Sequence, residues 1–145
     1  MEIFTIGFAG KSAETFFGLL RKHKMRRLID IRLSNSSQLA GFTKQDSLPF
    51  FLKELCDAEY VHELRFAPTE EMFISFKKEK GDWKVFERQF LALMKKRQIE
   101  KIIDKSLFEV PAVLLCGEAT PEHCHRRLVA EYFQSHWKGV TVTHL

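Results

Sequence analysis

The run Val-Pro-Ala-Val-Leu-Leu-Cys at residues 110–116 constrains the fold more than any other stretch. It is short and almost wholly apolar, as in a strand buried on both faces of a parallel sheet. Thr120, Pro121 and Glu122 then have the residue types of an N-cap, a first-position proline and a first-turn acid. They predict a helix from about residue 121, with an apolar stripe of Leu128, Val129, Tyr132, Phe133 and Trp137. The chain should therefore contain a strand followed directly by a helix here.

The same junction is the segment densest in reactive side chains. Cys116 and Glu118 leave the carboxyl end of the strand beside the amino end of the helix, where open α/β sheets place ligand crevices. Cys124 and His125, in the second turn of the predicted helix, align with its apolar stripe and should lean inward, with Arg126 next to them. The sequence thus predicts a site, without naming its reaction.

The rest of the chain alternates short strands with helices. Further strands are predicted at residues 3–6, 27–31, 59–62 and 140–144, the last as an edge strand. Residues 64–109 form a helical excursion between strands 3 and 4, with Thr69 and Asp82 as helix caps, and serve either as a crossover or as a lid over the crevice. We therefore predict one α/β domain over residues 1–145, a three-layer open sheet of about five mostly parallel strands with helices on both faces.

Composition sets limits on location and partners. The chain has 45% hydrophobic residues, no apolar stretch approaching a membrane span and no signal-like amino terminus, so we expect a cytoplasmic protein without membrane contact. Three cysteines are an odd number, which favours reduced thiols or ligands over disulfides. The net charge of +4 allows an anionic small molecule or nucleic acid as partner, although lysines spread over several helices are typical of solvated faces.

Polar residues at the ends of the other strands are further candidates. Asp30 and Arg32 should share one face, either as a surface pair or as a site pair in which Arg32 holds a carboxylate or phosphate. His62 and His144 each end a predicted strand and are either structural or part of the site. Because the carboxyl ends of parallel strands share one edge, we expect a cluster there of Gly7, Asp30, Arg32, Cys116 and Glu118.

The stretch from Gly7 to Ser12 resembles part of a phosphate-binding P-loop. A P-loop needs four residues between its glycines, whereas Gly7 and Gly10 enclose only two. The spacing argues against a P-loop and leaves a looser anion site at the following helix start open.

Several short motifs together resemble a known family. They are Thr5-Ile6-Gly7, Asp30-Ile31-Arg32, Gly41-Phe42, Tyr60-Val61-His62, Leu115-Cys116-Gly117-Glu118, Cys124-His125-Arg126 and His144-Leu145. In this order the chain resembles the bacterial and archaeal family called domain of unknown function 488. The resemblance implies a single α/β domain whose Asp-x-Arg, Cys-x-Glu and Cys-His-Arg elements form one site, and it brings no activity with it. Two loops depart from the family pattern: Leu33-Ser34-Asn35, where a proline is frequent, and Phe8-Ala9, where a polar pair is frequent.

Several chemistries fit the junction. Cys124 near a helix amino terminus, with His125 and Arg126 beside it, has the setting of a nucleophile with a lowered thiol pKa. Cys116, Cys124 and a histidine would suit zinc or iron, but the chain has no Cys-x-x-Cys pair, and adjacent helical residues point about 100° apart. A binding crevice without chemistry is a third interpretation. In a fourth, both cysteines only fill the core and Glu118 pairs with Arg126.

We favour an enzyme that acts on an anionic, phosphate- or carboxylate-bearing substrate such as a nucleotide. The alternatives are a non-catalytic nucleotide or nucleic-acid binding module and a Cys/His metal site. The predicted catalytic residues are Cys124, Cys116, Glu118, His125 and Asp30. The predicted substrate-binding residues are Gly7, Arg32, Arg126, His62 and His144. No metal ligand is assigned, and no cofactor is identified.

Overall fold

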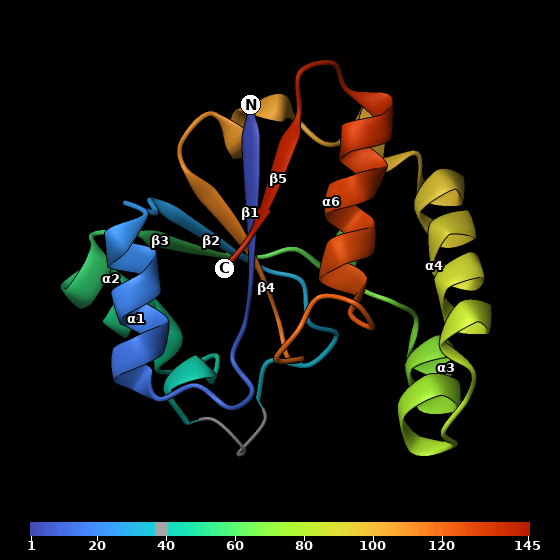
Figure 1. The fold of residues 1–145 in the computed structure, drawn as a ribbon, viewed down its shortest axis with the longest axis horizontal. Helices are drawn as coiled ribbons and strands as arrows, with labels where there is room; N and C mark the ends of the chain where they lie inside the picture. The colour runs from blue at the N-terminus through green and yellow to red at the C-terminus, as the bar shows by residue number, and fades with distance from the viewer. Residues whose placement is uncertain (37–40) are drawn as a thin grey trace.

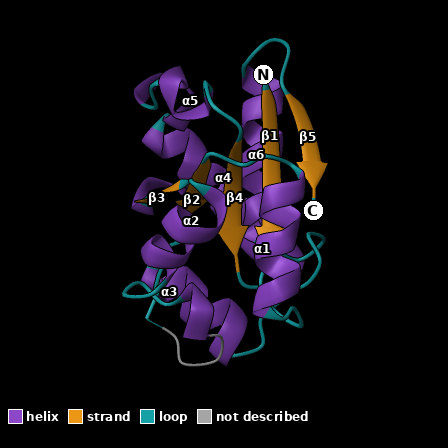
Figure 2. Ribbon diagram, turned by 90° about the vertical axis from the view of Figure 1, so that its left-hand side faces the viewer, coloured by secondary structure: helices purple, strands orange, loops and turns teal. Residues whose placement is uncertain are grey.

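The computed structural model describes residues 1–36 and 41–145 and contains one five-stranded parallel sheet over these residues (Figure 1). The strands are β1 (Glu2–Gly7), β2 (Arg27–Asp30), β3 (Glu59–His62), β4 (Ala112–Cys116) and β5 (Thr141–His144). Their order is β3-β2-β4-β1-β5, and all four pairings are parallel. Figure 2 shows the arrows of β4 and β5 pointing the same way. The prediction of a three-layer α/β fold is confirmed.

β4 lies at the centre of the sheet, as its apolar sequence predicts. All five of its residues are buried. Val113 and Leu115 belong to the core on one face of the sheet, and Leu114 and Cys116 belong to the core on the other. This is the two-residue alternation of a strand covered on both sides. β5, predicted as an edge strand, pairs only with β1 within the described sheet.

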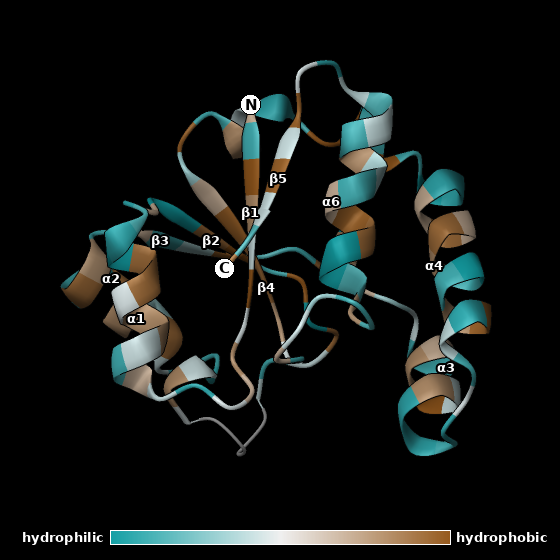
Figure 3. Ribbon diagram, in the orientation of Figure 1, coloured by the Kyte–Doolittle hydropathy of each residue, from teal (hydrophilic) through white to brown (hydrophobic). Residues whose placement is uncertain are grey.

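Helices cover both faces of the sheet. α1 (Ala13–Lys22) and α2 (Leu48–Cys56) pack on one face, and α6 (His125–His136) packs on the other with α4 (Trp83–Arg97) beside it (Figure 1). Ser12 caps α1, because its hydroxyl accepts a hydrogen bond from the backbone of Thr15. Figure 3 shows mostly apolar residues in the central strands and mixed apolar and polar bands around the helices, as expected of amphipathic helices on a buried sheet.

The helical excursion consists of short elements around α4. They are the 3-10 turn η2 (Leu64–Phe66), α3 (Glu70–Phe73), the π-helical turn η3 (Ile74–Lys78), α5 (Ile99–Ile102) and the 3-10 turn η4 (Lys105–Phe108). A further 3-10 turn, η1 (Gly41–Thr43), precedes α2. Thr69 and Asp82 cap α3 and α4 as predicted, since their side chains accept bonds from backbone N–H groups. The excursion is a crossover from β3 to β4.

The start of α6 differs from the prediction. The helix begins at His125 rather than near Pro121, and Cys124 lies outside it with extended backbone angles of φ −132° and ψ 137°. The backbone N–H of Cys124 donates to the carbonyl of Pro121, which closes a turn instead of a helical start. The start of this loop is held elsewhere, since the carbonyl of Gly117 accepts a bond from the backbone of Ala9 and the carbonyl of Glu118 accepts one from Arg126.

No helix among the described residues is long and apolar enough to cross a membrane.

Candidate functional site

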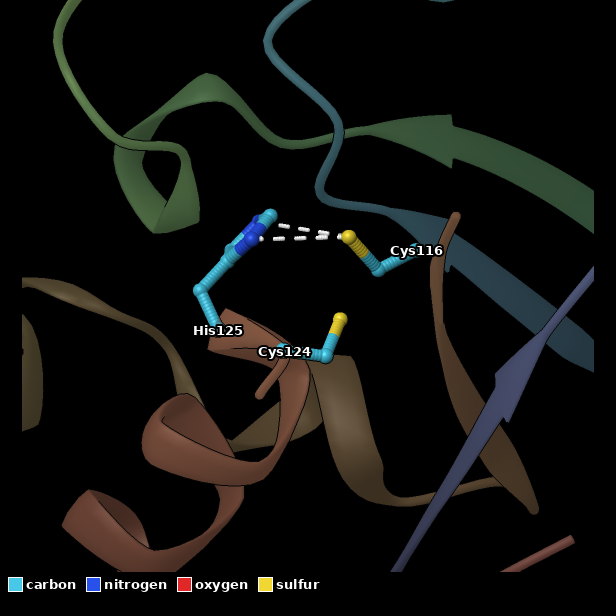
Figure 4. Close-up of side chains that lie close together, drawn as sticks. All are labelled: Cys116, Cys124 and His125. Atoms are coloured by element: carbon cyan, nitrogen blue, oxygen red, sulfur yellow. Dashed lines mark hydrogen bonds between the residues drawn. The ribbon is translucent and has the colours of Figure 1, made fainter. Parts of the chain in front are cut away.

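Cys116, Cys124 and His125 come together at the carboxyl end of β4 (Figure 4). Cys116 is the last residue of β4, Cys124 is the N-cap residue of α6, and His125 is the first residue of that helix. All three are buried, with at most 8% of each exposed. The Sγ atom of Cys116 lies 3.4 Å from Nδ1 of His125. The possible ligand atoms of the three side chains all lie within 4.8 Å of one another.

The imidazole of His125 is oriented by the backbone of the neighbouring strand end. Its Nε2 atom lies 2.8 Å from the carbonyl oxygen of Ile31, which can only accept a hydrogen bond. Nε2 therefore carries the proton, and Nδ1 is the unprotonated nitrogen. Sγ of Cys116 lies 3.4 Å from Nδ1 and 3.8 Å from Nε2, so the thiol lies beside the ring and off the axis of the Nδ1 lone pair. Burial lowers the pKa of His125, which keeps the ring neutral.

The two thiols differ in acidity. A hydrogen bond from Cys124 lowers the pKa of Cys116, and the backbone N–H of Gly117 and the charge of Arg126 act in the same direction against the effect of burial. Burial raises the pKa of Cys124 well above its usual value, and the neighbouring Cys116 adds to this. The prediction that Cys124 is the acidic thiol is therefore wrong. Cys124 is almost fully buried, and Cys116 is the more acidic of the two.

A cavity of about 360 Å³ opens beside this cluster. Cys116, Cys124 and His125 line it together with a set of apolar side chains, Phe8, Leu33, Pro68, Phe73, Phe76 and Phe86. Its charged lining residues are Arg32, Lys77 and Glu118. Lys77 of η3 forms an ion pair with the carboxylate of Glu118. The α3 and η3 segment thus forms a wall of the cavity within the crossover from β3 to β4.

Asp30 and Arg32 form a buried pair rather than a surface pair. The guanidinium of Arg32 donates from Nε and Nη2 to the two carboxylate oxygens of Asp30, at 2.9 and 2.7 Å. Asp30 is fully buried and also accepts a bond of 2.7 Å from the hydroxyl of Tyr60. Burial and this bond raise the pKa of Tyr60. Arg32 reaches the cavity wall, where its guanidinium lies 5.3 Å from the ring centroid of Phe8.

The strand alternation places Asp30 away from the thiols. Asp30 is two residues after Leu28 and therefore points to the same face of the sheet, toward α1 and α2. Cys116 points to the opposite face, toward α6. Asp30 does not line the cavity. In the structure its carboxylate orients the guanidinium of Arg32 through two hydrogen bonds.

The two strand-end histidines lie outside the cavity lining. His62 bonds through Nε2 to the carbonyl of Arg32 at 2.8 Å and through Nδ1 to Asn35 at 3.2 Å, so it supports the loop after β2. His144 lies on β5, and its Nδ1 is 2.6 Å from the hydroxyl of Thr5 on β1. They lie on strands at opposite edges of the sheet.

Gly7 and Arg126 shape the loop that follows β4. Gly7 pairs in register with Cys116, and a β-carbon on Gly7 would overlap the backbone carbonyl of Glu118. The same carbonyl accepts a hydrogen bond of 2.7 Å from Nη1 of Arg126. Arg126 is fully buried, and its Nε and Nη2 atoms have no hydrogen-bond partner among the described residues. The Glu118 carboxylate pairs with Lys77, so the predicted alternative of a Glu118–Arg126 ion pair is wrong.

Comparison with known families identifies this arrangement at the level of a family. The family model described as "Domain of unknown function DUF488" matches residues 12–133, which is most of the chain. The protein belongs to the DUF488 family. No curated protein and no solved structure matches the chain.

In this DUF488 protein the predicted strand ends do meet at one edge of the sheet. Gly7 pairs with Cys116, and Asp30 pairs with Leu115 on the other side of β4. Of the predicted catalytic residues, all except Asp30 line the cavity. Of the predicted substrate-binding residues, only Arg32 lines it.

The cavity is also lined by four residues that the sequence did not predict as site residues, namely Phe73, Phe76, Lys77 and His123. The helical pattern after Thr69 places Phe73 and Phe76 on an apolar face, but no motif marks Lys77. A π-helical turn shifts the side-chain directions that a regular helix predicts, and such turns are frequent at functional sites. His123 stacks on Trp83 with the ring centroids 5.1 Å apart, a contact between segments distant in sequence.

Cys124 and His125 were expected to be consecutive helical residues pointing about 100° apart, which was one of the two objections to a metal site. The structure removes that objection. Because Cys124 precedes the helix with an extended backbone, both side chains reach Cys116. These three residues could hold a metal ion.

Proposed function

We propose that the protein is an enzyme that acts on a small anionic molecule with an apolar part, at a reactive centre of Cys116, Cys124 and His125. The observation that carries this proposal is the position of the centre on an apolar cavity that also bears Arg32 and Lys77. A soft sulfur, an imidazole, two cations and the carboxylate of Glu118, which pairs with Lys77, border one cavity. Binding alone would not require the first two.

The substrate class follows from the cavity. A volume of about 360 Å³ suits a small molecule rather than a polymer. Phe73, Phe76 and Phe86 offer apolar surface to a hydrocarbon or aromatic group. Arg32 and Lys77 offer positive charge to a phosphate or carboxylate, which would compete with Glu118 for Lys77. A nucleotide has both parts.

The reaction class favoured by these groups is hydrolysis or group transfer. Both need a nucleophile held beside the substrate and cations that stabilise the negative charge developing in the transition state. Cys116 is the candidate nucleophile, and Arg32, held in place by Asp30, supplies a fixed positive charge at the cavity wall.

A panel of matched compounds tests the proposal. Aryl and alkyl phosphates and carboxylates, including nucleoside monophosphates, are compared with their uncharged alcohols and amides for thermal stabilisation and for turnover by mass spectrometry. Anionic members should raise the melting temperature, and at least one should be converted. Conversion should disappear in Cys116→Ser and persist in Cys56→Ser, because Cys56 lies on α2 away from the cavity. Equal stabilisation by the uncharged analogues, or conversion retained by Cys116→Ser, would overturn the proposal.

Nucleic acid is the other anionic partner to compare. A single-stranded oligonucleotide whose affinity falls steeply with salt, with no conversion of the panel, would favour a nucleic-acid binding module over the enzyme.

A further inference from the structure

Three donor side chains are grouped closely enough to surround one metal ion. Tetrahedral zinc, with bonds of about 2.3 Å to sulfur and about 2.0–2.1 Å to nitrogen, separates its ligand atoms by about 3.5–3.8 Å. Sγ of Cys116 and Nδ1 of His125 are 3.4 Å apart, and the ligand atoms of all three side chains lie within 4.8 Å of one another. The side chains would have to turn and draw together to form a coordination shell, but all three donor atoms are already grouped in one place. We propose that Cys116, Cys124 and His125 bind one divalent ion of the zinc class.

The type of donor selects the ion. Two thiolates and one imidazole are soft and borderline ligands, which suit zinc and the late first-row metals. Magnesium and calcium prefer oxygen ligands, and the one carboxylate among the described residues that lines the cavity, that of Glu118, is paired with Lys77. The proposed site therefore discriminates against the abundant hard cations.

The surroundings of His125 are those of a ligating histidine. Its Nε2–H group donates to the carbonyl of Ile31 at 2.8 Å, which fixes the ring and leaves Nδ1 as the ligand atom. Histidines that bind metals usually donate their other ring N–H to a carbonyl or carboxylate in this way.

The charges nearby are also consistent with an ion. Two buried thiolates without a cation would be costly, and a divalent ion neutralises both. Arg126 is fully buried beside this loop, without an ion pair in the described chain and with two nitrogens lacking hydrogen-bond partners. An anionic fourth ligand would give the neutral ion–dithiolate centre one negative charge, which would balance this guanidinium.

The fourth coordination position faces the cavity, because all three donor residues line it. Three protein ligands with one open position is the pattern of a catalytic rather than a structural zinc site. For this role the inference rests on the proposed function, since the open position would hold a water molecule or an oxygen of the substrate's anionic group. Metal binding itself does not depend on catalysis.

Metal content and cobalt spectroscopy test the proposal. Untagged protein, purified without chelator, should contain close to one equivalent of zinc by mass spectrometry, and Cys56→Ser should contain the same. Chelator-treated protein titrated with Co²⁺ should develop a thiolate-to-cobalt charge-transfer band and visible bands of tetrahedral cobalt. Cys124→Ser and His125→Gln should lower zinc affinity by more than about 100-fold, beyond what loss of an outer contact causes.

Circular dichroism and thermal unfolding of each variant in excess chelator show whether it folds like the metal-free wild type. A folded Cys124→Ser with wild-type zinc affinity, or a wild type that gives no charge-transfer band, would overturn the inference. The outcome also separates the two proposals. Stoichiometric zinc without conversion of any panel compound would leave the metal site and remove the enzyme, whereas conversion by fully chelated protein would leave the enzyme and remove the catalytic role of the ion.

Discussion

Gly7 leaves room for the backbone of Glu118 at the point where the loops after β1 and β4 meet. A β-carbon at Gly7 would overlap the carbonyl oxygen of Glu118 and would lie 2.9 Å from Nη1 of Arg126, which bonds the same carbonyl. The backbone of Ala9 also donates to the carbonyl of Gly117 at 3.0 Å. The path of the loop between Cys116 and Cys124 therefore requires a residue without a side chain at position 7.

Gly7→Ala should lower the free energy of unfolding by about 1–3 kcal/mol, the usual cost of overpacking a buried contact. The matched control is Gly18→Ala in the middle of α1, where an added β-carbon meets no atom within 4 Å. That change should stabilise the protein by about 0.5–1 kcal/mol, because alanine is the better helix former. Urea denaturation measures both. If Gly7→Ala were as stable as the wild type, the close approach of the two loops would be in doubt.

Arg32→Met should lower the free energy of unfolding by about 3–5 kcal/mol, because it leaves the fully buried carboxylate of Asp30 without its cation. Adding Asp30→Asn to this variant should recover at least part of the loss, since it removes the buried charge. The control is Arg26→Met, whose ion pair with Asp57 is exposed and should be worth less than about 1 kcal/mol. Equal effects of the two arginine substitutions would contradict the buried pair.

Alkylation of chelator-treated protein should reveal the charge of the cavity. The rate with iodoacetate, which is anionic, divided by the rate with neutral iodoacetamide should be higher for Cys116 than for Cys56. The reason is that Lys77 and Arg32 border the cavity beside Cys116. Cys124 should be the slower of the two cavity thiols, since only 2% of it is exposed. Peptide mass spectrometry follows each site. The same reagent ratio at Cys116 and Cys56 would argue against an anion-attracting cavity.

Lys77→Gln should weaken binding of the anionic panel compounds by about tenfold, equivalent to ~1.4 kcal/mol. Lys77 lines the cavity, whereas Lys95 lies on the exposed side of α4, so Lys95→Gln should leave the affinity unchanged. Isothermal titration at two salt concentrations provides the comparison. A loss shared equally by both variants would indicate a diffuse basic surface instead of a site.

His144 should make stability depend on pH. Burial lowers its pKa, as does the charge of Arg126 with a smaller effect of Arg127, while Glu131 and Glu122 act in the opposite direction. The unfolded chain, with a histidine pKa of about 6.5, then binds more protons than the folded protein as the pH falls, so stability is lost on acidification. His144→Gln removes this contribution together with the bond to Thr5. The free energies of unfolding of wild type and variant, measured by urea denaturation from pH 8 to pH 5, should approach each other as the pH falls. A difference between the two that stays constant with pH would exclude this role of His144.

The strands and most helices follow from local signals in the sequence. β3 has the predicted bounds, β4 is the buried central strand, and Thr69 and Asp82 cap the helices that they were expected to cap. Side-chain alternation, helical apolar stripes and caps act over a few residues, so they can be recognised without the rest of the molecule. The grouping of Gly7, Asp30 and Cys116 at one edge follows in turn from the parallel sheet.

Only the tertiary structure decided which of these residues act together. The start of α6 at His125, which turns Cys124 toward Cys116, depends on a loop held by β1 and Arg126. The partner of the Glu118 carboxylate is Lys77, 41 residues away. Asp30 pairs with Leu115 rather than with Cys116, and because side chains alternate along a strand it points to the opposite face of the sheet from Cys116. These outcomes are set by contacts between distant segments, whose energies outweigh the local preferences that a sequence displays.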